Sequence, residues 1–374
     1  MKFVVSSTEL LTPLQAISRV ISSKNSMSIL DNFLFQLSGN TLTITTSDLE
    51  TTVQASIPVQ DVEREGTVAI LKLLTDSLKE FPEQPLEFSF DQENMMIDLS
   101  SEKGKSHFPG LPGDDFPEPP QLQEDYTELS IPAAVLLEGI SRSLYATAEE
   151  EMRPVMNGIL FDIDENQTTL VASDAHKLLC YTRKDIIASK PSKFILPKKP
   201  ASLLKTLLPK VSENVQIQFD DKNAVFILPN YRLVCRLVEG NYPAYRTVLP
   251  ANNINKAVVD RIEFLSSVRR VAVCSNQASN LIRIKLEHEE ITVSAQNLDF
   301  SISAYERIGC QYDGDPMEIG FKWGFLAEIL ANLPGQSVSF ELSDPSRAAL
   351  LIPMELSDAN EEICALIMPL MIGS

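Results

Sequence analysis

The chain has 374 residues, of which 44% are hydrophobic, and a formal net charge of −19 at pH 7. This length suggests two or three domains, and no apolar run approaches the roughly 20 residues that a membrane-spanning helix needs. The start of the chain lacks the apolar core of a signal peptide, and the five cysteines are scattered without a C-x-x-C pair. The composition therefore predicts a protein of the reduced cytoplasm with no disulfide framework, zinc site or membrane span.

An amphipathic helix is the first predicted element, because Leu10, Leu14 and Ile17 recur at helical spacing. A pair of strands follows across residues 33–53, and a short helix, a proline-containing turn and a further strand occupy residues 73–91. Apolar and polar residues alternate along these strands, which is typical of antiparallel sheets with one buried face. The sequence therefore predicts an α+β unit in which helices cover the buried face of the sheets.

The same order of elements recurs twice more along the chain. Residues 203–220 and 326–341 repeat the short helix, the proline-containing turn and the strand, and the spacing is that of a whole domain. Phe90 and Phe219 are 129 residues apart, and Phe219 and Phe340 are 121 apart. A repeat of this length indicates three tandem copies of one domain, which we expect at residues 1–122, 123–251 and 252–374.

Basic residues are concentrated on the predicted helices. The six helical stretches with their flanks hold 14 Lys or Arg against 7 Asp or Glu, whereas the rest of the chain holds 18 against 44. One interpretation is that Lys and Arg gather there as good helix formers, yet Glu is an equally good one and is scarce in these stretches. The other is a positively charged surface for a polyanion, formed by residues 8–24, 72–80, 131–146, 198–210, 255–275 and 320–333.

Tandem copies of this kind predict an arc, and the helix count sets the size of a closed ring. Helices pack about 10 Å apart, so six helices close a circle of about 19 Å and twelve close one of about 38 Å. Only the larger circle has room for a hydrated double helix. We therefore expect two chains, joined head to tail, with the sheets outside and two helices per domain lining the inside. Such a bore would contact phosphates without reading bases.

Four motifs connect this repeat to a known family: MRPVMNGILF (152–161), ASDAHKL (172–178), EGNYPAYRTVLP (239–250) and LIMPL (366–370). Together they resemble the bacterial sliding clamps, the beta subunits of DNA polymerase III, and the resemblance covers essentially the whole chain. It implies a non-catalytic processivity factor without a cofactor. Such a homodimer encircles duplex DNA, is loaded by an ATP-dependent clamp loader, and tethers polymerases and repair proteins that carry a short apolar linear motif.

The resemblance also implies a peptide-binding cleft between the second and third copies. Apolar walls with adaptable methionines suit varied apolar peptides, and a few polar groups could orient an extended ligand. For Met156 and Leu178, plain core packing is an equally reasonable interpretation of the residues alone. Carried over by motif, the cleft consists of Arg153, Met156, Ser173, Ala175, His176, Lys177, Leu178, Pro243, Thr247, Val248, Met368, Pro369 and Leu370.

The chain departs from the family at the rim of this cleft. Ala175-His176-Lys177 stands where the family often has Gly-His-Arg, and the C-terminal MPLMIGS (368–374) lacks the usual arginine. A lysine cannot form the forked pair that an arginine makes with a carboxylate. We therefore expect the polar contacts of this rim to differ from those of other members.

Two further sets of residues follow from the ring. The bore would be lined by Lys24, which matches a basic residue of the family, and by candidates from charge alone: Arg19, Lys72, Lys79, Arg142, Lys198, Lys199, Lys205, Arg269, Arg270 and Lys322. At the dimer seam, edge strands of the first copy and of the partner's third copy would pair. The residues expected there are Lys103, Lys105, Phe108, Val273, Cys274, Tyr305 and Glu306.

Enzymatic interpretations fail on the residues. The tripeptide at 104–106 resembles the end of a phosphate-binding loop, but Leu99 stands where the first glycine is needed and no helix is predicted to follow. The three histidines lie in no recognisable nucleophile or metal pattern. Asp48 and Asp174 recur at matched strand bends, which predicts turn chemistry, and the glutamates at 149–151 are typical of a solvated loop. We therefore predict neither catalysis nor a metal site.

One alternative function stays open at this point. A three-domain scaffold that binds only proteins would also use tandem copies, with its basic helices facing acidic partners. The two functions differ in where the basic side chains lie, because a clamp needs them along one continuous surface. Binding to circular DNA that is lost when the circle is cut would separate them.

Overall fold

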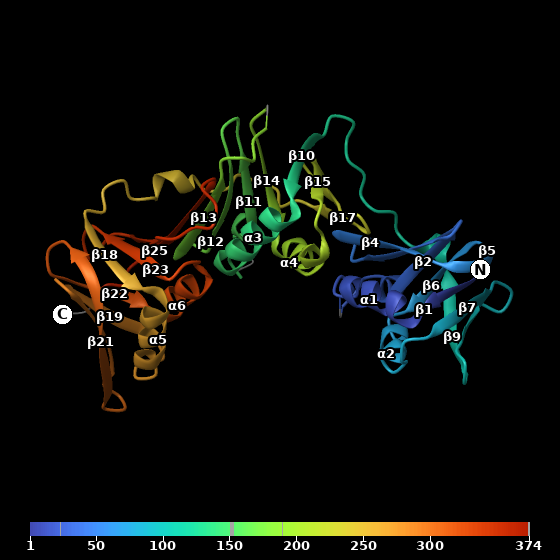
Figure 1. Ribbon diagram of the computed structural model, residues 1–374, viewed down its shortest axis with the longest axis horizontal. Coiled ribbons are helices and arrows are strands. Elements are labelled where there is room, and N and C mark those ends of the chain that lie inside the picture. Colours follow the sequence, from blue (N-terminus) through green and yellow to red (C-terminus); the bar gives the residue numbers. More distant parts are fainter. Residues whose placement is uncertain (23, 150–152, 189, 373–374) are drawn as a thin grey trace. The chain divides into compact units, whose positions relative to one another are not determined.

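The computed structural model describes residues 1–22, 24–149, 153–188 and 190–372 (Figure 1). The chain divides into two compact units. The first comprises Met1–Leu137 and Lys199–Leu237, and the second comprises Glu138–Lys198 and Val238–Ser374. Each unit therefore contains residues of two successive predicted copies. The boundaries expected from the repeat, 1–122, 123–251 and 252–374, stay a prediction.

The first unit is built on one sheet of 13 strands. Its helices are α1 (Ser7–Ile17), α2 (Leu74–Lys79) and α4 (Lys198–Leu207). Its strands are β1 (Lys2–Ser6), β2 (Asn32–Ser38), β3 (Thr41–Ser47), β4 (Thr51–Pro58), β5 (Gln60–Arg64), β6 (Gly66–Leu71), β7 (Pro85–Asp91), β8 (Met96–Ser100), β9 (Lys105–Pro112), β10 (Thr127–Pro132), β15 (Asn214–Phe219), β16 (Asn223–Ile227) and β17 (Tyr231–Arg236). They are ordered β10-β15-β16-β17-β4-β3-β2-β6-β9-β8-β7-β1-β5.

The second unit is built on one sheet of 12 strands. Its helices are α5 (Arg261–Ala272) and α6 (Trp323–Asn332), and α3 (Ala133–Ser143) lies mostly within it. Its strands are β11 (Gly158–Ile163), β12 (Thr168–Ser173), β13 (Lys177–Arg183), β14 (Ser192–Pro197), β18 (Asn255–Asp260), β19 (Leu281–Glu287), β20 (Glu290–Asn297), β21 (Ile302–Asp313), β22 (Met317–Lys322), β23 (Ser337–Leu342), β24 (Ala349–Pro353) and β25 (Glu361–Ile367). They are ordered β14-β11-β12-β13-β25-β24-β23-β18-β21-β20-β19-β22.

The helices begin where the sequence provides a cap. Ser6 accepts a hydrogen bond from the Glu9 N–H at the start of α1, at 3.1 Å. Asp260 accepts one from the Glu263 N–H at the start of α5, at 2.8 Å. These side chains satisfy backbone donors that the first turn of a helix leaves unpaired. Each of the six predicted helical stretches contains an α-helix, and all pairings between the described strands are antiparallel, so the predicted α+β class is confirmed.

The strand registers give the true correspondence between copies. The last strand residue before the first helix of each copy pairs with Pro85, Asn214 and Ser337, respectively. Counting from these positions, Phe90 corresponds to Phe219, as predicted. The counterpart of Phe219 in the third copy is Leu342, so the match to Phe340 was wrong by two positions. A shift of two keeps a side chain on the same face of a strand, which is why Phe340 is equally buried.

Successive copies are joined by strand pairing within each unit. In the first unit β17 of the second copy pairs with β4 of the first, and Leu233 lies opposite Val53. In the second unit β25 of the third copy pairs with β13 of the second, and Ala365 lies opposite Leu179. We call these pairings the first and second junctions. Backbone hydrogen bonds therefore continue across the boundary between copies.

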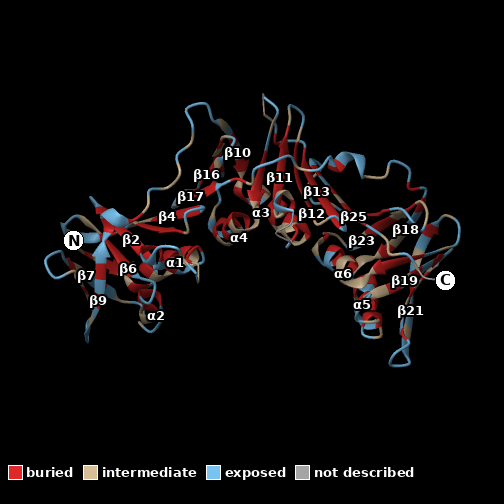
Figure 2. Cartoon of the chain, turned by 180° about the vertical axis from the view of Figure 1, so that it is seen from behind, coloured by how far each residue is buried: buried red, intermediate tan, exposed pale blue. Residues whose placement is uncertain are grey.

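Buried residues lie along the strands and helices of each unit (Figure 2). In the third copy Phe340 is fully buried between Phe264 of α5, at 5.9 Å between ring centroids, and Phe321 of β22, at 5.8 Å. Tilted rings at this spacing add to the free energy of burial. This cluster joins α5 to the sheet behind it.

Replacing Phe340 by Ala should lower the free energy of unfolding of the second unit by about 3–5 kcal/mol, because a large buried ring is lost and a cavity stays. Trp323, the only tryptophan of the chain, lies at the start of α6 in the same unit. Its fluorescence during urea unfolding measures the change. A loss below about 1 kcal/mol would contradict the described packing, and Phe340→Leu is the conservative control.

Candidate functional site

An apolar cluster fills the second junction, where the sequence predicts the peptide cleft. It joins β13 of the second copy to β24 and β25 of the third, and the segment after β17 covers it. Val155, Tyr242 and Leu249 pack against its edge. This junction cluster consists of Leu160, Val171, Leu178, Cys180, Ile195, Tyr245, Ala348, Leu350 and Leu366.

The corresponding positions of β3 and β4 at the first junction are polar. The hairpins β3–β4 and β12–β13 have matching registers, so Thr52 corresponds to Leu178. Thr52 and Ser47 hydroxyls are 2.9 Å apart, and the Gln54 amide donates to Thr45 at 3.4 Å. At these positions the second junction is therefore apolar where the first is polar, through substitutions at equivalent positions of one repeated fold.

The turn of the second hairpin follows the predicted turn chemistry. Asp174 accepts hydrogen bonds from the N–H groups of His176, at 2.9 Å, and Lys177, at 2.8 Å. Asp48 holds the first hairpin in the same way, through the N–H groups of Glu50 and Thr51. Ala175 has φ +74°, a conformation that favours glycine. A glycine would adopt this conformation without strain, and this chain tolerates the strain of an alanine.

Lys177 does not present a free ammonium at the rim of the cleft. Its side chain is 6% exposed, and its Nζ lies 2.7 Å from Asp174 and 2.9 Å from Glu328 of α6. The ring of Phe325 lies 4.6 Å from the same Nζ, and His176 stacks on that ring at 5.5 Å. The lysine therefore ties the hairpin of the second copy to a helix of the third. Ala175 and His176 are the exposed residues of this turn.

A side chain that fills the first junction has no counterpart at the second. Lys199, the second residue of α4, lies 2.5 Å from Asp48 and donates to the Val20 carbonyl at 2.7 Å. The matching residue of α6 is Gly324, where an added Cβ would meet nothing within 4 Å. The space beside the second hairpin therefore stays open.

The segment after β17 supplies the predicted residues Pro243, Thr247 and Val248. It forms a 3-10 turn at Tyr245–Thr247, after which Val248 is 54% exposed. The Tyr245 hydroxyl donates to the buried Asp162 at 2.8 Å. Burial and then this hydrogen bond raise the pKa of Tyr245.

The C-terminal segment supplies Met368, Pro369 and Leu370. The Met368 N–H donates to the His176 carbonyl at 2.8 Å, and the Leu370 N–H donates to the Gly320 carbonyl at 2.8 Å. A hollow of about 440 Å³ beside Leu370 is also lined by Met371 and Ile372. Ser173, Leu178 and Met156 are buried, whereas Arg153 is exposed. The residues at 373–374 lie outside the described ones.

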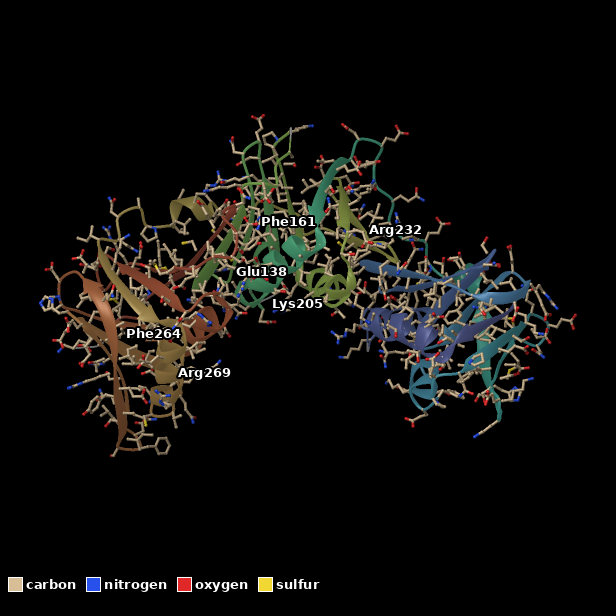
Figure 3. All side chains as sticks on the ribbon, viewed as in Figure 1. Glu138, Phe161, Lys205, Arg232, Phe264 and Arg269 are labelled. Carbon is tan, nitrogen blue, oxygen red and sulfur yellow. The ribbon has the colours of Figure 1, made fainter. Side chains whose placement is uncertain are left out.

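The predicted bore residues fall into two groups, and Lys199 and Arg270, which pair with Asp48 and Glu306, belong to the first. In the first, ion pairs or carbonyls already engage the side chain: Arg142 contacts Glu138 and the Asn332 carbonyl, Lys198 contacts Glu149, and Lys79 contacts Asp76. Arg19 donates to Thr206 at 3.1 Å, and Lys322 lies 4.6 Å from the Phe325 ring. The second group is exposed and consists of Lys24, Lys72, Lys205 and Arg269. Lys205 extends from α4 and Arg269 from α5 (Figure 3).

The predicted seam residues lie on β9 and β21, directly after α5, and, for Lys103, in the bend before β9. Arg270 of α5 binds Glu306 through two hydrogen bonds, of 2.6 and 2.5 Å, and thereby lowers the pKa of Glu306. Lys105 pairs with Asp98 at 2.6 Å, Lys103 is exposed and Phe108 is buried. Val273 and Tyr305 are 78% and 67% exposed, and Cys274 is half-buried.

The sequence analysis missed three apolar residues beside Tyr305. Leu298 and Phe300, at the tip of the β20–β21 hairpin, are 80% and 71% exposed, and Ile302 is 41% exposed. Leu298 and Tyr305 line a hollow of about 490 Å³. An exposed apolar surface of this kind marks an interaction site. The sequence feature that could have revealed them is a pair of large apolar residues in a hairpin turn, where polar residues are usual.

Comparison with known proteins agrees with this architecture. Family models of the DNA polymerase III beta subunit match residues 1–120 (N-terminal domain), 130–244 (central domain) and 246–371 (C-terminal domain). The chain belongs to the DNA polymerase III beta-subunit family, the sliding clamps. The chain is therefore a non-catalytic processivity factor built of three tandem clamp domains.

Individual relatives cover the chain from end to end. The beta sliding clamp of Synechococcus elongatus is 28% identical over the whole of both chains, and that of Proteus mirabilis is 29% identical over 92% of this chain and 94% of its own. A crystal structure of the Pseudomonas aeruginosa sliding clamp superposes with a TM-score of 0.91 at 26% identity and covers both chains completely. Another, bound to griselimycin, superposes with a TM-score of 0.94 at 24% identity.

Two further observations bear on the excluded functions. No described helix has the length and apolar character to cross a membrane. Within the described ranges, no group of three or more His, Cys, Asp or Glu side chains could hold a metal ion, and Glu150 and Glu151 lie outside those ranges.

Replacing Lys177 by Ala should lower the free energy of unfolding of the second unit by about 2–4 kcal/mol, because it leaves Asp174 and Glu328 facing each other without a cation. Urea unfolding followed by Trp323 fluorescence at neutral pH measures the loss. Lys177→Arg, which keeps the charge, should restore most of it. Equal stability of the Ala variant and the wild type would show that the lysine does not tie the hairpin to α6.

Proposed function

We propose that the chain encircles duplex DNA as a head-to-tail dimer in the cytoplasm and tethers polymerases and repair proteins through the second junction. The observation that carries this proposal is a pair of unpaired strand edges, which could form a third junction between two chains. β21 and β9 each have one edge, along 302–309 and 105–109, on which no described strand pairs. In the third copy, β21 occupies the place that β4 and β13 occupy in the first and second copies. In the first copy, β9 occupies the place that β17 and β25 occupy in the second and third copies. A scaffold that never binds DNA is not favoured by the family.

The existing junctions predict the register of the third. In each copy the count starts at the residue that faces the last strand position before the first helix, which is Pro85, Asn214 or Ser337. We count along that strand and then across the next two strand pairings. Ser106, Leu233 and Ala365 then occupy the same position of the repeat. Glu306 of β21 lies beside α5, because two residues of this helix lower its pKa. Arg270 has the larger effect and Ser267 the smaller one. Because Ser267 and Gly139 occupy the same helical position, Glu306 corresponds to Tyr181, which contacts Gly139.

This correspondence makes Ala304 the counterpart of Leu179, which pairs with Ala365 at the second junction. Ser106 of one copy should therefore face Ala304 of the other, and Phe108 should face Ile302. All four side chains then lie on the helix-covered faces of the joined sheets. Pairing would satisfy two exposed edges at once.

The ends of the helices support the same seam. At the first junction Lys199 of α4 pairs with Asp48 in the hairpin turn. The matching residue before α2 is Leu73, which is 60% exposed, and the third hairpin carries exposed Leu298 and Phe300 at its tip. An apolar contact would thus replace the ion pair of the first junction, and burying these side chains provides the driving force for association.

Cysteines at Ser106 and Ala304, in a background with Cys274→Ser and Cys310→Ser, should form a disulfide between chains on mild oxidation. Directly opposed residues of an antiparallel pair have Cβ atoms close enough for this bond. Denaturing gel electrophoresis should show two-chain products. Ser106→Cys with Tyr305→Cys is the matched control, because side chains one position apart point to opposite faces. Cross-linking that is absent, or equal in both pairs, would contradict the register.

The basic surface of the helices supports DNA as the encircled partner. Lys72, Lys205 and Arg269 are exposed on or beside α2, α4 and α5, one in each copy. Cations that contact phosphates release counterions, so binding should weaken steeply with salt and should not depend on sequence. Of these three, none is engaged by an ion pair in the described part of the chain. They are the sharpest test of the surface.

Replacing Lys72, Lys205 and Arg269 together by Glu should reduce retention on nicked circular DNA at least tenfold, after loading by the clamp loader of the same organism with ATP. Wild-type protein should stay on the circle and leave when the DNA is cut. The control is Lys222→Glu, Lys285→Glu and Arg347→Glu, three exposed cations outside the helices, which should change retention less than twofold. Equal losses in both variants would exclude a specific basic bore.

The junction cluster supports the site for partner peptides. Solved sliding clamps from Pseudomonas aeruginosa and Bartonella birtlesii are bound to griselimycin, and we propose that the same ligand occupies the second junction here. His176, Val248 and Met368 are exposed around the buried cluster, so they form its accessible wall. A short apolar motif of a polymerase, a repair protein or the loader would bury these side chains.

A further inference from the structure

We propose that Asp162 is a positioning residue for the peptide cleft, which it shapes by fixing the turn that carries Thr247 and Val248. This inference rests on the proposed binding of ligands at the second junction. Asp162 itself lies on β11 and is 3% exposed. It therefore acts on a ligand only through the segment it holds.

Three donors converge on this carboxylate. One oxygen accepts from the Tyr245 hydroxyl at 2.8 Å and from Arg246 at 3.2 Å. The other oxygen lies 3.1 Å from the ammonium of Lys193, its cross-strand neighbour on β14. Arg246 also donates to the Tyr245 hydroxyl at 3.0 Å. A buried carboxylate needs such donors, and two of the three come from the segment after β17.

Two kinds of interaction fix the held turn: Tyr242, Tyr245 and Leu249 pack in or against the junction cluster, and Tyr245 and Arg246 bind Asp162. Between β17 and β18 the chain forms no strand, and its local order is the 3-10 turn at Tyr245–Thr247. Within it, the Val248 N–H donates to the Tyr245 carbonyl at 3.2 Å, and the Thr247 hydroxyl donates to the Ala244 carbonyl at 2.7 Å. These bonds close the turn on itself. The bonds from Tyr245 and Arg246 to Asp162 anchor it to the sheet.

The hydrogen bonds to Asp162 lie beside the apolar second junction, and the first copy has no residues that could form the bond from Tyr245 at the polar first junction. In the first copy Gln36 stands at the position of Asp162 and is exposed, and Pro119 stands at the position of Tyr245. Pro119 has no side-chain donor, so the bond made by Tyr245 cannot form in the first copy. The second copy thus has both the apolar surface and the hydrogen bonds that hold the turn carrying Val248 beside it.

Loss of the anchor should weaken ligand binding because the wall must then be ordered during binding. Hydrogen bonds to a charged group are among the stronger ones in proteins, and part of that energy holds the turn in place. Asp162→Asn and Tyr245→Phe should each weaken griselimycin binding about five- to tenfold. Lys193→Gln is the matched control, because it removes the positive charge beside Asp162 without cutting the link to the turn. Its binding should change less than twofold.

Calorimetric titration of the dimer with griselimycin provides the test, together with a double-mutant cycle through Val248→Ala. If Asp162 acts through the turn, Asp162→Asn should weaken binding less than twofold once Val248 is truncated. A general loss of stability would instead act equally in both backgrounds. Phe340→Leu, which loosens a distant part of the same unit, should leave the affinity unchanged.

The outcomes separate this inference from the function on which it rests. Wild-type protein that does not bind griselimycin would overturn the proposed cleft and the role of Asp162 with it. Wild-type binding with unchanged affinity in both Asp162→Asn and Tyr245→Phe would overturn only the positioning role. Additive effects of Asp162→Asn and Val248→Ala would do the same.

Discussion

Backbone pairing between copies is the constraint on which the rest of this structure depends. Two junctions use the same strands of the repeat, β17 with β4 and β25 with β13. A strand edge with unpaired N–H and C=O groups is a liability that proteins cover. Joining the copies in this way leaves one edge of β9, along residues 105–109, and one edge of β21, along residues 302–309, on which no described strand pairs. In the proposed ring a second copy covers both, so closure follows from the same interaction that joins the copies.

Differences between equivalent positions give the junctions separate roles. Thr52 of the first junction is replaced by Leu178 at the second, which makes the second junction apolar. Lys199 of the first is replaced by Gly324, which leaves space there. At the proposed seam, the exposed Leu73 and Leu298 would replace an ion pair by apolar contact. The backbone of the repeat supplies the geometry, and a few side chains at each junction decide whether it packs, binds a ligand or associates.

The sequence predicts the repeat well because strand alternation and helical periodicity are local signals. The six helices and the antiparallel sheets are found where expected, whereas the match of Phe219 to Phe340 fails, because alternation is blind to a shift of two residues. Burial of Lys177 between Asp174 and Glu328 could not be foreseen, since Glu328 lies in another copy. The same holds for Asp162 and Tyr245, 83 residues apart. Long-range polar contacts leave no periodic trace, and they are what shape the candidate site.

Small-angle X-ray scattering of the protein in solution tests ring closure most directly. A ring closed at the third junction predicts the mass of two chains and a distance distribution depleted at short separations, as for a particle with a central hole. Scattering from a single chain at micromolar concentration, or from a filled two-chain particle, would contradict closure through β9 and β21.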